Sequence, residues 1–156
     1  MPFTTVQIGD RSIEVDLERT RAAYARVERG RAERCGCLYC RNFVEARDNI
    51  YPAAFLAILE SLGIAFDKEA EVYEYGPIEA GFAGYGGRFN FFGTAARDPE
   101  PSIARDEPTD DFRSGFSAEY PAFHTELTGA KWSIQFHCRV PWLLDEQPPV
   151  SYKAKS

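Results

Sequence analysis

The sequence predicts an α+β fold in which two main helices of the N-terminal half pack on a mostly antiparallel, aromatic-rich sheet. After a short N-terminal hairpin, helical patterns fill the chain up to Asp67 and further strand patterns gather beyond it, without the alternation of strand and helix that builds a parallel sheet. Twelve Phe, eight Tyr and two Trp residues supply large side chains of the kind that favour strands. A length of 156 residues suits one domain. We therefore expect a single α+β domain at residues 1–146 and a solvated C-terminal tail at residues 147–156.

A β-hairpin and a helix are predicted at the start of the chain. Residues 3–15 contain two short strand patterns around Gly9, a residue type that favours tight turns. Asp16 follows at the position of a helix N-cap, where its carboxylate can accept a hydrogen bond from a backbone N–H. The helical pattern runs to about Arg29, and Gly30 is expected to end the helix in the left-handed conformation that glycine adopts easily.

The second predicted helix begins after Pro52, which suits a first helical turn because the N–H that proline lacks would have no partner there. Its apolar residues are spaced three and four positions apart and therefore share one face of the helix. They are Phe55, Ile58, Leu59 and Leu62. Gly63 is expected to end this helix, with Ile64 returning to contact Leu59 in a Schellman cap.

Four segments after Asp67 have strand patterns. They are residues 71–75, 85–95, 114–120 and 132–140. The last segment has the clearest alternation, with apolar side chains on one face and polar side chains on the other. A segment rich in proline and acidic residues lies between the second and third strand patterns, at residues 97–111, and we expect a surface loop there.

The charge and the hydropathy of the sequence limit which binding partners and which cellular compartment we expect for the protein. The formal net charge of −6 disfavours binding to the phosphate backbone of nucleic acids. The N-terminal residues lack the basic and apolar regions of a signal peptide, and no apolar run reaches the 18 or so residues of a membrane span. We therefore expect a cytoplasmic protein with reduced thiols, whose partner is another protein rather than nucleic acid or a membrane.

The most distinctive segment is RCGCLYCRNF at residues 34–43, which holds three of the four cysteines of the chain. Cys37 and Cys40 have the two-residue spacing of half a zinc site, since this spacing allows two thiolates to reach one ion. Cys35 can add a third thiolate from the same turn. The segment therefore predicts a metal site, with zinc as the expected ion.

A tetrahedral zinc ion needs a fourth ligand, and the candidates are Cys138, His137, His124 or a carboxylate. In the strand pattern of residues 132–140, Cys138 falls on the apolar face, where a buried thiol is the simpler interpretation. His137 falls on the polar face and can reach a metal, so we name it as the fourth ligand beside the three cysteines, with another side chain or an open position as the alternatives.

A second hypothesis is a thiol-dependent redox protein that uses the Cys37-x-x-Cys40 pair. Residues 38–46 have a helical composition, so these thiols can lie at a helix start, where the helix dipole and Arg34 or Arg41 would lower a thiol pKa. A strand of a βαβ unit, which precedes such a pair in thioredoxin-like proteins, is missing from the pattern here.

A third hypothesis is an acidic protein-binding domain in which the cysteines are incidental. The sequence shows no pairing of acid and base and no catalytic triad, so no catalytic residue is assigned. We therefore favour a structural or interaction module with a metal-binding turn over an enzyme.

Several segments together resemble a family of small uncharacterised bacterial proteins. They are the C-x-C-x-x-C-x-N-F run at residues 35–43, the helix of residues 55–63, the stretch of residues 69–73 and the Pro-Trp-Leu-Leu-Asp-Glu ending at residues 141–146. The resemblance covers residues 35 to 146 and implies a bacterial, cytosolic origin, but it implies no activity.

Overall fold

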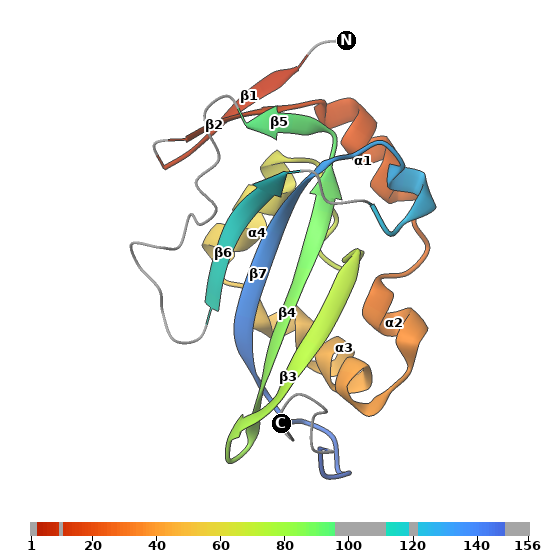
Figure 1. The fold of residues 1–156 in the computed structure, drawn as a ribbon, viewed down its shortest axis with the longest axis vertical. Helices are drawn as coiled ribbons and strands as arrows, with labels where there is room; N and C mark the ends of the chain where they lie inside the picture. The colour runs from red at the N-terminus through yellow and green to blue at the C-terminus, as the bar shows by residue number, and fades with distance from the viewer. Residues whose placement is uncertain (1–2, 10, 96–111, 119–121, 149–156) are drawn as a thin grey trace.

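The computed structural model describes residues 3–9, 11–95, 112–118 and 122–148, whose strands form two antiparallel sheets (Figure 1). The three-stranded sheet has the order β1–β2–β5, with strands Thr4–Ile8, Arg11–Val15 and Gly93–Ala95. The four-stranded sheet has the order β3–β4–β7–β6, with strands Glu71–Glu79, Phe82–Phe91, Trp132–Pro141 and Phe112–Ala118. Helices and antiparallel sheets together confirm the predicted α+β class.

The helices precede the larger sheet along the chain. They are α1 (Leu17–Arg26), α2 (Arg31–Cys35), α3 (Leu38–Ile50) and α4 (Ala53–Ser61), and a short 3-10 helix, η2 (Thr125–Leu127), follows β6. Figure 1 shows α3 and α4 behind the four-stranded sheet, whose other face turns toward the viewer. None of the described helices combines the length and the apolar composition needed to cross a membrane.

An aromatic cluster lies between the sheet and these helices. Phe136 of β7 is fully buried, and its ring centroid lies 5.3 to 6.1 Å from those of five other rings. They belong to Phe43, Tyr51, Phe55, Phe89 and Phe112. The rings come from α3, α4, three strands and the segment between the helices, so the predicted aromatic core joins all of these elements.

The local signals at the first hairpin and helix are confirmed. β1 and β2 pair as an antiparallel hairpin, and the Asp16 carboxylate accepts the Arg19 N–H at 3.1 Å as the N-cap of α1. The predicted end of this helix is wrong, because α1 stops at Arg26 and Gly30 instead precedes α2 with a φ of −70°. A Cβ at this glycine would lie 2.3 Å from the Glu69 carboxylate, so close packing rather than helix termination requires glycine there.

The predicted end of the second helix is confirmed at α4. The chain turns at Gly63, where φ is +81°. The Gly63 N–H donates to the Glu60 carbonyl at 3.0 Å, and the Ile64 N–H donates to the Leu59 carbonyl at 2.9 Å. These two hydrogen bonds form the Schellman cap that the sequence predicted.

Two strand predictions need correction, and two segments lie outside the described residues. The segment predicted as one strand at 85–95 divides at Phe92 into β4 and β5, which belong to different sheets. Phe92 is held at this division because its N–H donates to Thr20 Oγ1 at 3.1 Å and its carbonyl accepts the Asp16 N–H at 2.9 Å. β3 is longer than predicted and extends to Glu79. The predicted loop at residues 97–111 and most of the predicted tail fall on residues that the structure does not describe.

Candidate metal centre

The three cysteines of the predicted turn lie together where α2 meets α3. Cys35 is the last residue of α2, Cys37 is the N-cap of α3, and Cys40 lies in the first turn of α3. The three Sγ atoms all lie within 4.8 Å of one another. Among the described residues, this is the only group of three or more histidine, cysteine or acidic side chains that is close enough to share a metal ion.

The backbone of the turn brings the thiols together. Gly36 separates the two helices in the left-handed conformation, with a φ of +76°, which glycine adopts without steric cost. Cys37 then adopts an extended conformation, and its Sγ accepts the Cys40 N–H at 3.4 Å as a side-chain cap of α3. The sharp turn and the cap together direct all three side chains to one place.

The thiols of the cluster differ in burial and in acidity. Cys35 and Cys37 are exposed, whereas Cys40 is buried in the core. A hydrogen bond from the Cys37 backbone N–H lowers the pKa of the Cys35 thiol, with smaller contributions from the neighbouring thiols. Burial raises the pKa of Cys40, whose thiol also interacts with Cys35. Of this pair, Cys35 therefore loses its proton more readily than Cys40.

His137, the fourth predicted ligand, lies away from the cysteines. Cys138 and Phe136 face the helices, and His137, between them on β7, points to the opposite face of the sheet. Its Nδ1 lies 3.1 Å from the Tyr75 hydroxyl, and the two rings stack with centroids 5.9 Å apart. The structure therefore brings together three of the four predicted ligands, and this geometry gives no support to His137 as the fourth.

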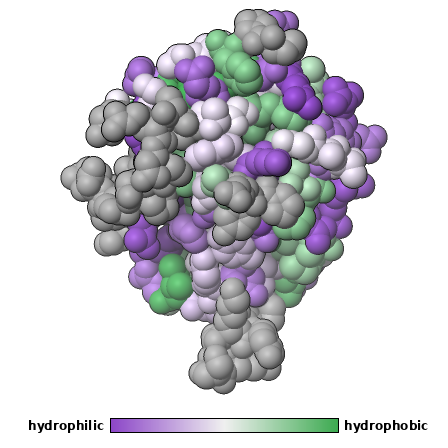
Figure 2. Space-filling model, turned by 45° about the horizontal axis from the view of Figure 1, so that its top comes forward, coloured by the Kyte–Doolittle hydropathy of each residue, from purple (hydrophilic) through white to green (hydrophobic). Residues whose placement is uncertain are grey.

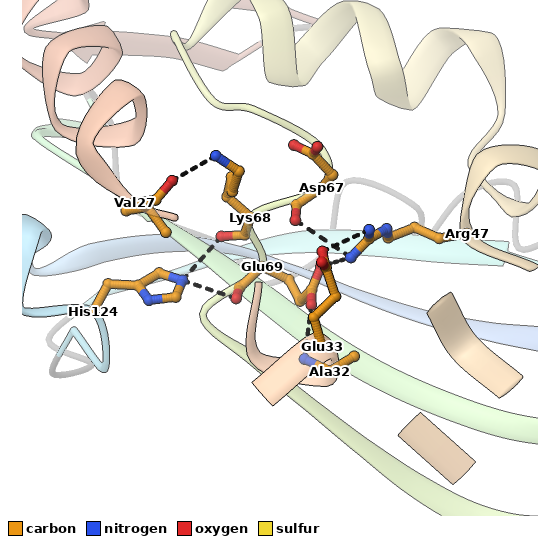
Figure 3. Close-up of polar contacts among 8 residues, drawn as sticks. All are labelled: Val27, Ala32, Glu33, Arg47, Asp67, Lys68, Glu69 and His124. Atoms are coloured by element: carbon orange, nitrogen blue, oxygen red, sulfur yellow. Dashed lines mark hydrogen bonds and ion pairs between the residues drawn. The ribbon is translucent and has the colours of Figure 1, made fainter. Parts of the chain in front are cut away.

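The other two named candidates for the fourth ligand, Cys138 and His124, also lie outside the cysteine cluster. Cys138 is buried as the strand pattern predicted, and burial raises its pKa to about 12. His124 is buried, and its Nε2 lies 2.9 Å from the Glu69 carbonyl and 3.1 Å from the Lys68 carbonyl (Figure 3). Since carbonyl oxygens only accept hydrogen bonds, this Nε2 carries a proton and is committed to the backbone.

A buried ion pair supports α2 from the side of the sheet (Figure 3). The Glu69 carboxylate is fully buried, accepts the Ala32 N–H at 2.9 Å and pairs with Arg47 Nη1 at 3.2 Å. Arg47 Nη2 pairs with Glu33 of α2 at 2.8 Å. Desolvation raises the pKa of Glu69, and the Ala32 N–H and the Arg47 guanidinium oppose this rise. This group is not predicted by the sequence pattern, because its members are up to 37 residues apart.

Asn42 connects the cysteine helix to the segment that follows β7. The side chain is fully buried, and its Nδ2 donates to the Pro141 carbonyl at 3.1 Å while its Oδ1 accepts the Leu143 N–H at 2.6 Å. Nearby, the rings of Tyr39 and Trp142 pack edge to face with centroids 5.4 Å apart. In the sequence, this contact is indicated by the polar Asn42, which lies between Tyr39 and Phe43 on the buried face of α3.

Two parts of the resemblance therefore touch in the structure, since residues 35–43 carry Asn42 and residues 141–146 carry its partners. Comparison with protein-family models, with curated proteins and with solved structures found no match. The resemblance thus stays a prediction, and the function is argued from the geometry of the cysteine cluster.

Proposed function

We propose that the turn between α2 and α3 binds one zinc ion through Cys35, Cys37 and Cys40, and that the protein is a structural or interaction module rather than an enzyme. The mutual approach of the three Sγ atoms to within 4.8 Å supports this proposal. In a tetrahedral zinc site with Zn–S bonds of about 2.3 Å, two sulfur ligands are about 3.8 Å apart. Side-chain adjustments of about 1 Å are therefore enough to accommodate the ion.

The chemistry of the three thiols also suits a metal. Zinc, iron and copper(I) prefer thiolate ligands, and zinc is the common ion in closed structural sites. The exposed Cys35, whose pKa is lowered, is the thiol of the cluster that gives up its proton to a metal more readily than Cys40 does. Binding to Cys40 then releases the proton that the buried thiol holds, so metal affinity should rise with pH. Water or a further side chain completes the fourth position.

A structural role follows from the position of the turn. α2 has only five residues, too few to be stable alone. The Glu69 carboxylate holds its N-terminal part, and the cysteines lie at its C-terminal end. An ion at the turn would fix the second end of α2 and join it to α3. We further propose that residues 1–146 form one domain, that the protein works in the cytosol, and that its partner is a protein.

Metal analysis tests the proposal directly. Untagged protein purified under reductant should contain about one zinc ion per chain by mass spectrometry, and Cys37→Ser should lose the ion together with thermal stability. Cys138→Ala is the matched control, because this thiol is buried outside the cluster and its loss should leave the metal content unchanged. Metal-free wild-type protein, or a Cys37→Ser variant that melts like the wild type, would contradict the proposal.

A second candidate is thiol–disulfide exchange at the same turn. The lowered pKa and exposure of Cys35, beside two further thiols, favour it. Under this hypothesis the protein contains no metal, Cys37→Ser leaves the melting temperature almost unchanged, and mild oxidation forms one disulfide within the cluster. The predicted pair Cys37–Cys40 and pairs that include Cys35 are distinguished by peptide mapping of the oxidised protein.

A further inference from the structure

A second feature of the molecule lies on the face of the four-stranded sheet opposite α3 and α4. A cavity of about 670 Å³ opens there, a volume within the range of small-molecule sites. The side chains around it come from β3, β6 and β7, and they are Tyr75, Ile78, Arg113, Gln135, His137 and Arg139. The cavity is separate from the cysteine turn, since His137 and Phe136 point to opposite faces of β7.

Glycines of β4 allow side chains of β3 to lie close to the sheet beside the cavity. Gly84 pairs with Arg139 and Gly86 pairs with His137, so both positions face the cavity side of the sheet. The ring of Tyr73 already fills the space above Gly86, where a Cβ would lie 2.5 Å from the ring. Above Gly84, a Cβ would lie 3.3 Å from Ile78 Cγ2 and 3.4 Å from Tyr75 Cβ, which is a tight contact. Glycine at position 84 therefore allows Ile78 and Tyr75, which border the cavity, to pack closely on the sheet.

The charge at the cavity is positive although the whole chain is acidic. Arg113 pairs in register with His137, is exposed, and forms no ion pair among the described residues. Arg139 is held differently, by an ion pair with Glu79 and by the Phe82 ring, whose centroid lies 4.4 Å from its guanidinium carbon. Burial and the charge of Arg113 lower the pKa of His137 and so favour its neutral form. Arg113 is thus the group that can take an anion.

The rim of the cavity adds apolar surface. Large apolar side chains are highly exposed at only five described positions, namely Phe3, Tyr75, Ile78, Phe123 and Leu143. Two of the five, Tyr75 at 39% and Ile78 at 51% exposure, border the cavity. Figure 2, tilted by 45° from the view of Figure 1, shows hydrophobic side chains in separate groups among hydrophilic ones. A flat apolar ligand would cover both rim side chains.

We propose that this cavity binds a small aromatic ligand with one anionic group, whose ring lies against Tyr75 and Ile78 and whose anion pairs with Arg113. A guanidinium binds carboxylate and phosphate through parallel N–H donors, so both anions fit this chemistry. The neutral imidazole of His137 and the amide of Gln135 border the same space and add hydrogen-bonding groups. This site goes beyond the proposed metal centre and does not depend on it.

The test is a titration of the full chain with benzoate, phenyl phosphate and the neutral analogue benzamide, followed by the backbone amide shifts of Gly84, Gly115 and His137. Saturable shifts with one or both anions, and none with benzamide, are expected. Binding of one anion alone identifies that ligand class. Equal binding of benzamide, or no saturation with either anion up to about 10 mM, would overturn the proposal.

Matched variants separate the two contacts. Arg113→Gln should weaken binding at least about tenfold, whereas Arg26→Gln, an equal charge change on the exposed face of α1, should leave it unchanged. Ile78→Ser should also weaken binding, and Leu143→Ser is its control because the two side chains are 51% and 52% exposed. Wild-type affinity in Arg113→Gln would refute the assignment of the anion site. Zinc content, measured on the same samples, reports separately on the cysteine turn.

Discussion

Asn42→Ala is the sharpest test of how the cysteine helix is held. The wild-type side chain is fully buried and makes three hydrogen bonds to groups far away in the sequence. It donates to the Pro141 carbonyl at 3.1 Å and to the Tyr85 hydroxyl at 3.4 Å, and it accepts the Leu143 N–H at 2.6 Å. Alanine removes all three bonds and leaves the backbone of residues 141–143 without its anchor on α3.

The expected cost follows from the groups that lose their partners. The Pro141 carbonyl and the Leu143 N–H are orphaned, while the Tyr85 hydroxyl keeps its bond to the Tyr39 carbonyl at 2.7 Å. Each orphaned, partly buried group costs about 1–2 kcal/mol, so the free energy of unfolding should fall by about 2–4 kcal/mol. For a domain of this size, the melting temperature should fall by about 4–16 °C.

Chemical and thermal unfolding of two variants provide the assay. Asn49→Ala is the control, because Asn49 lies exposed on the same helix and its replacement should change the free energy of unfolding by less than about 0.5 kcal/mol. Hydrogen exchange of the Leu143 amide should also accelerate in Asn42→Ala alone, since this amide loses its acceptor. Equal stability of the two variants, with unchanged exchange, would refute the argument that Asn42 anchors the C-terminal segment.

Three further outcomes are expected. In metal-free, reduced protein, iodoacetamide should modify Cys35 long before Cys138, because the pKa of Cys35 is lowered and burial raises that of Cys138 to about 12; peptide mass spectrometry measures the order. Arg47→Met should lower the free energy of unfolding by about 3–5 kcal/mol, since it leaves the Glu69 carboxylate buried without its cation; denaturant unfolding measures the loss. His137 has a pKa below its ordinary value, so its contribution to stability is present above about pH 6.5 and is lost as the pH falls through the lowered value. NMR titration of the imidazole should show the lowered pKa, and a pKa at or above the ordinary value would contradict the structure.

Sequence predicted the features that depend on neighbouring residues and missed those that depend on distant ones. The Asp16 cap and the Gly63 turn are local, and both are confirmed. Gly30 was misinterpreted because its role is set by Glu69, a residue of another element. The division of the predicted strand at Phe92 depends on Thr20, which lies 72 positions earlier. Neither of these two long-range contacts can be predicted from the residues next to Gly30 or Phe92 in the sequence.

The same distinction applies to the candidate metal centre. The spacing of the three cysteines predicted their proximity, because a turn of six residues limits how far the thiols can separate. Strand alternation placed His137 correctly on the polar face of β7, but it does not show on which side of the sheet the cysteine turn lies. The helices cover the face of Cys138, so the polar face that carries His137 points away from the turn.

The burial of Cys40 links the proposed metal to the stability of the whole domain. Its side chain belongs to the hydrophobic core, whereas Cys35 and Cys37 lie at the surface, so an ion held by all three would tie the exposed turn to the core. The same first turns of α3 carry Asn42, which anchors the segment after β7. Loss of metal should therefore loosen both the end of α2 and the contacts of residues 141–146. A structural zinc site should stabilise these contacts in this way. A cluster used only for thiol exchange does not need to be connected to the core.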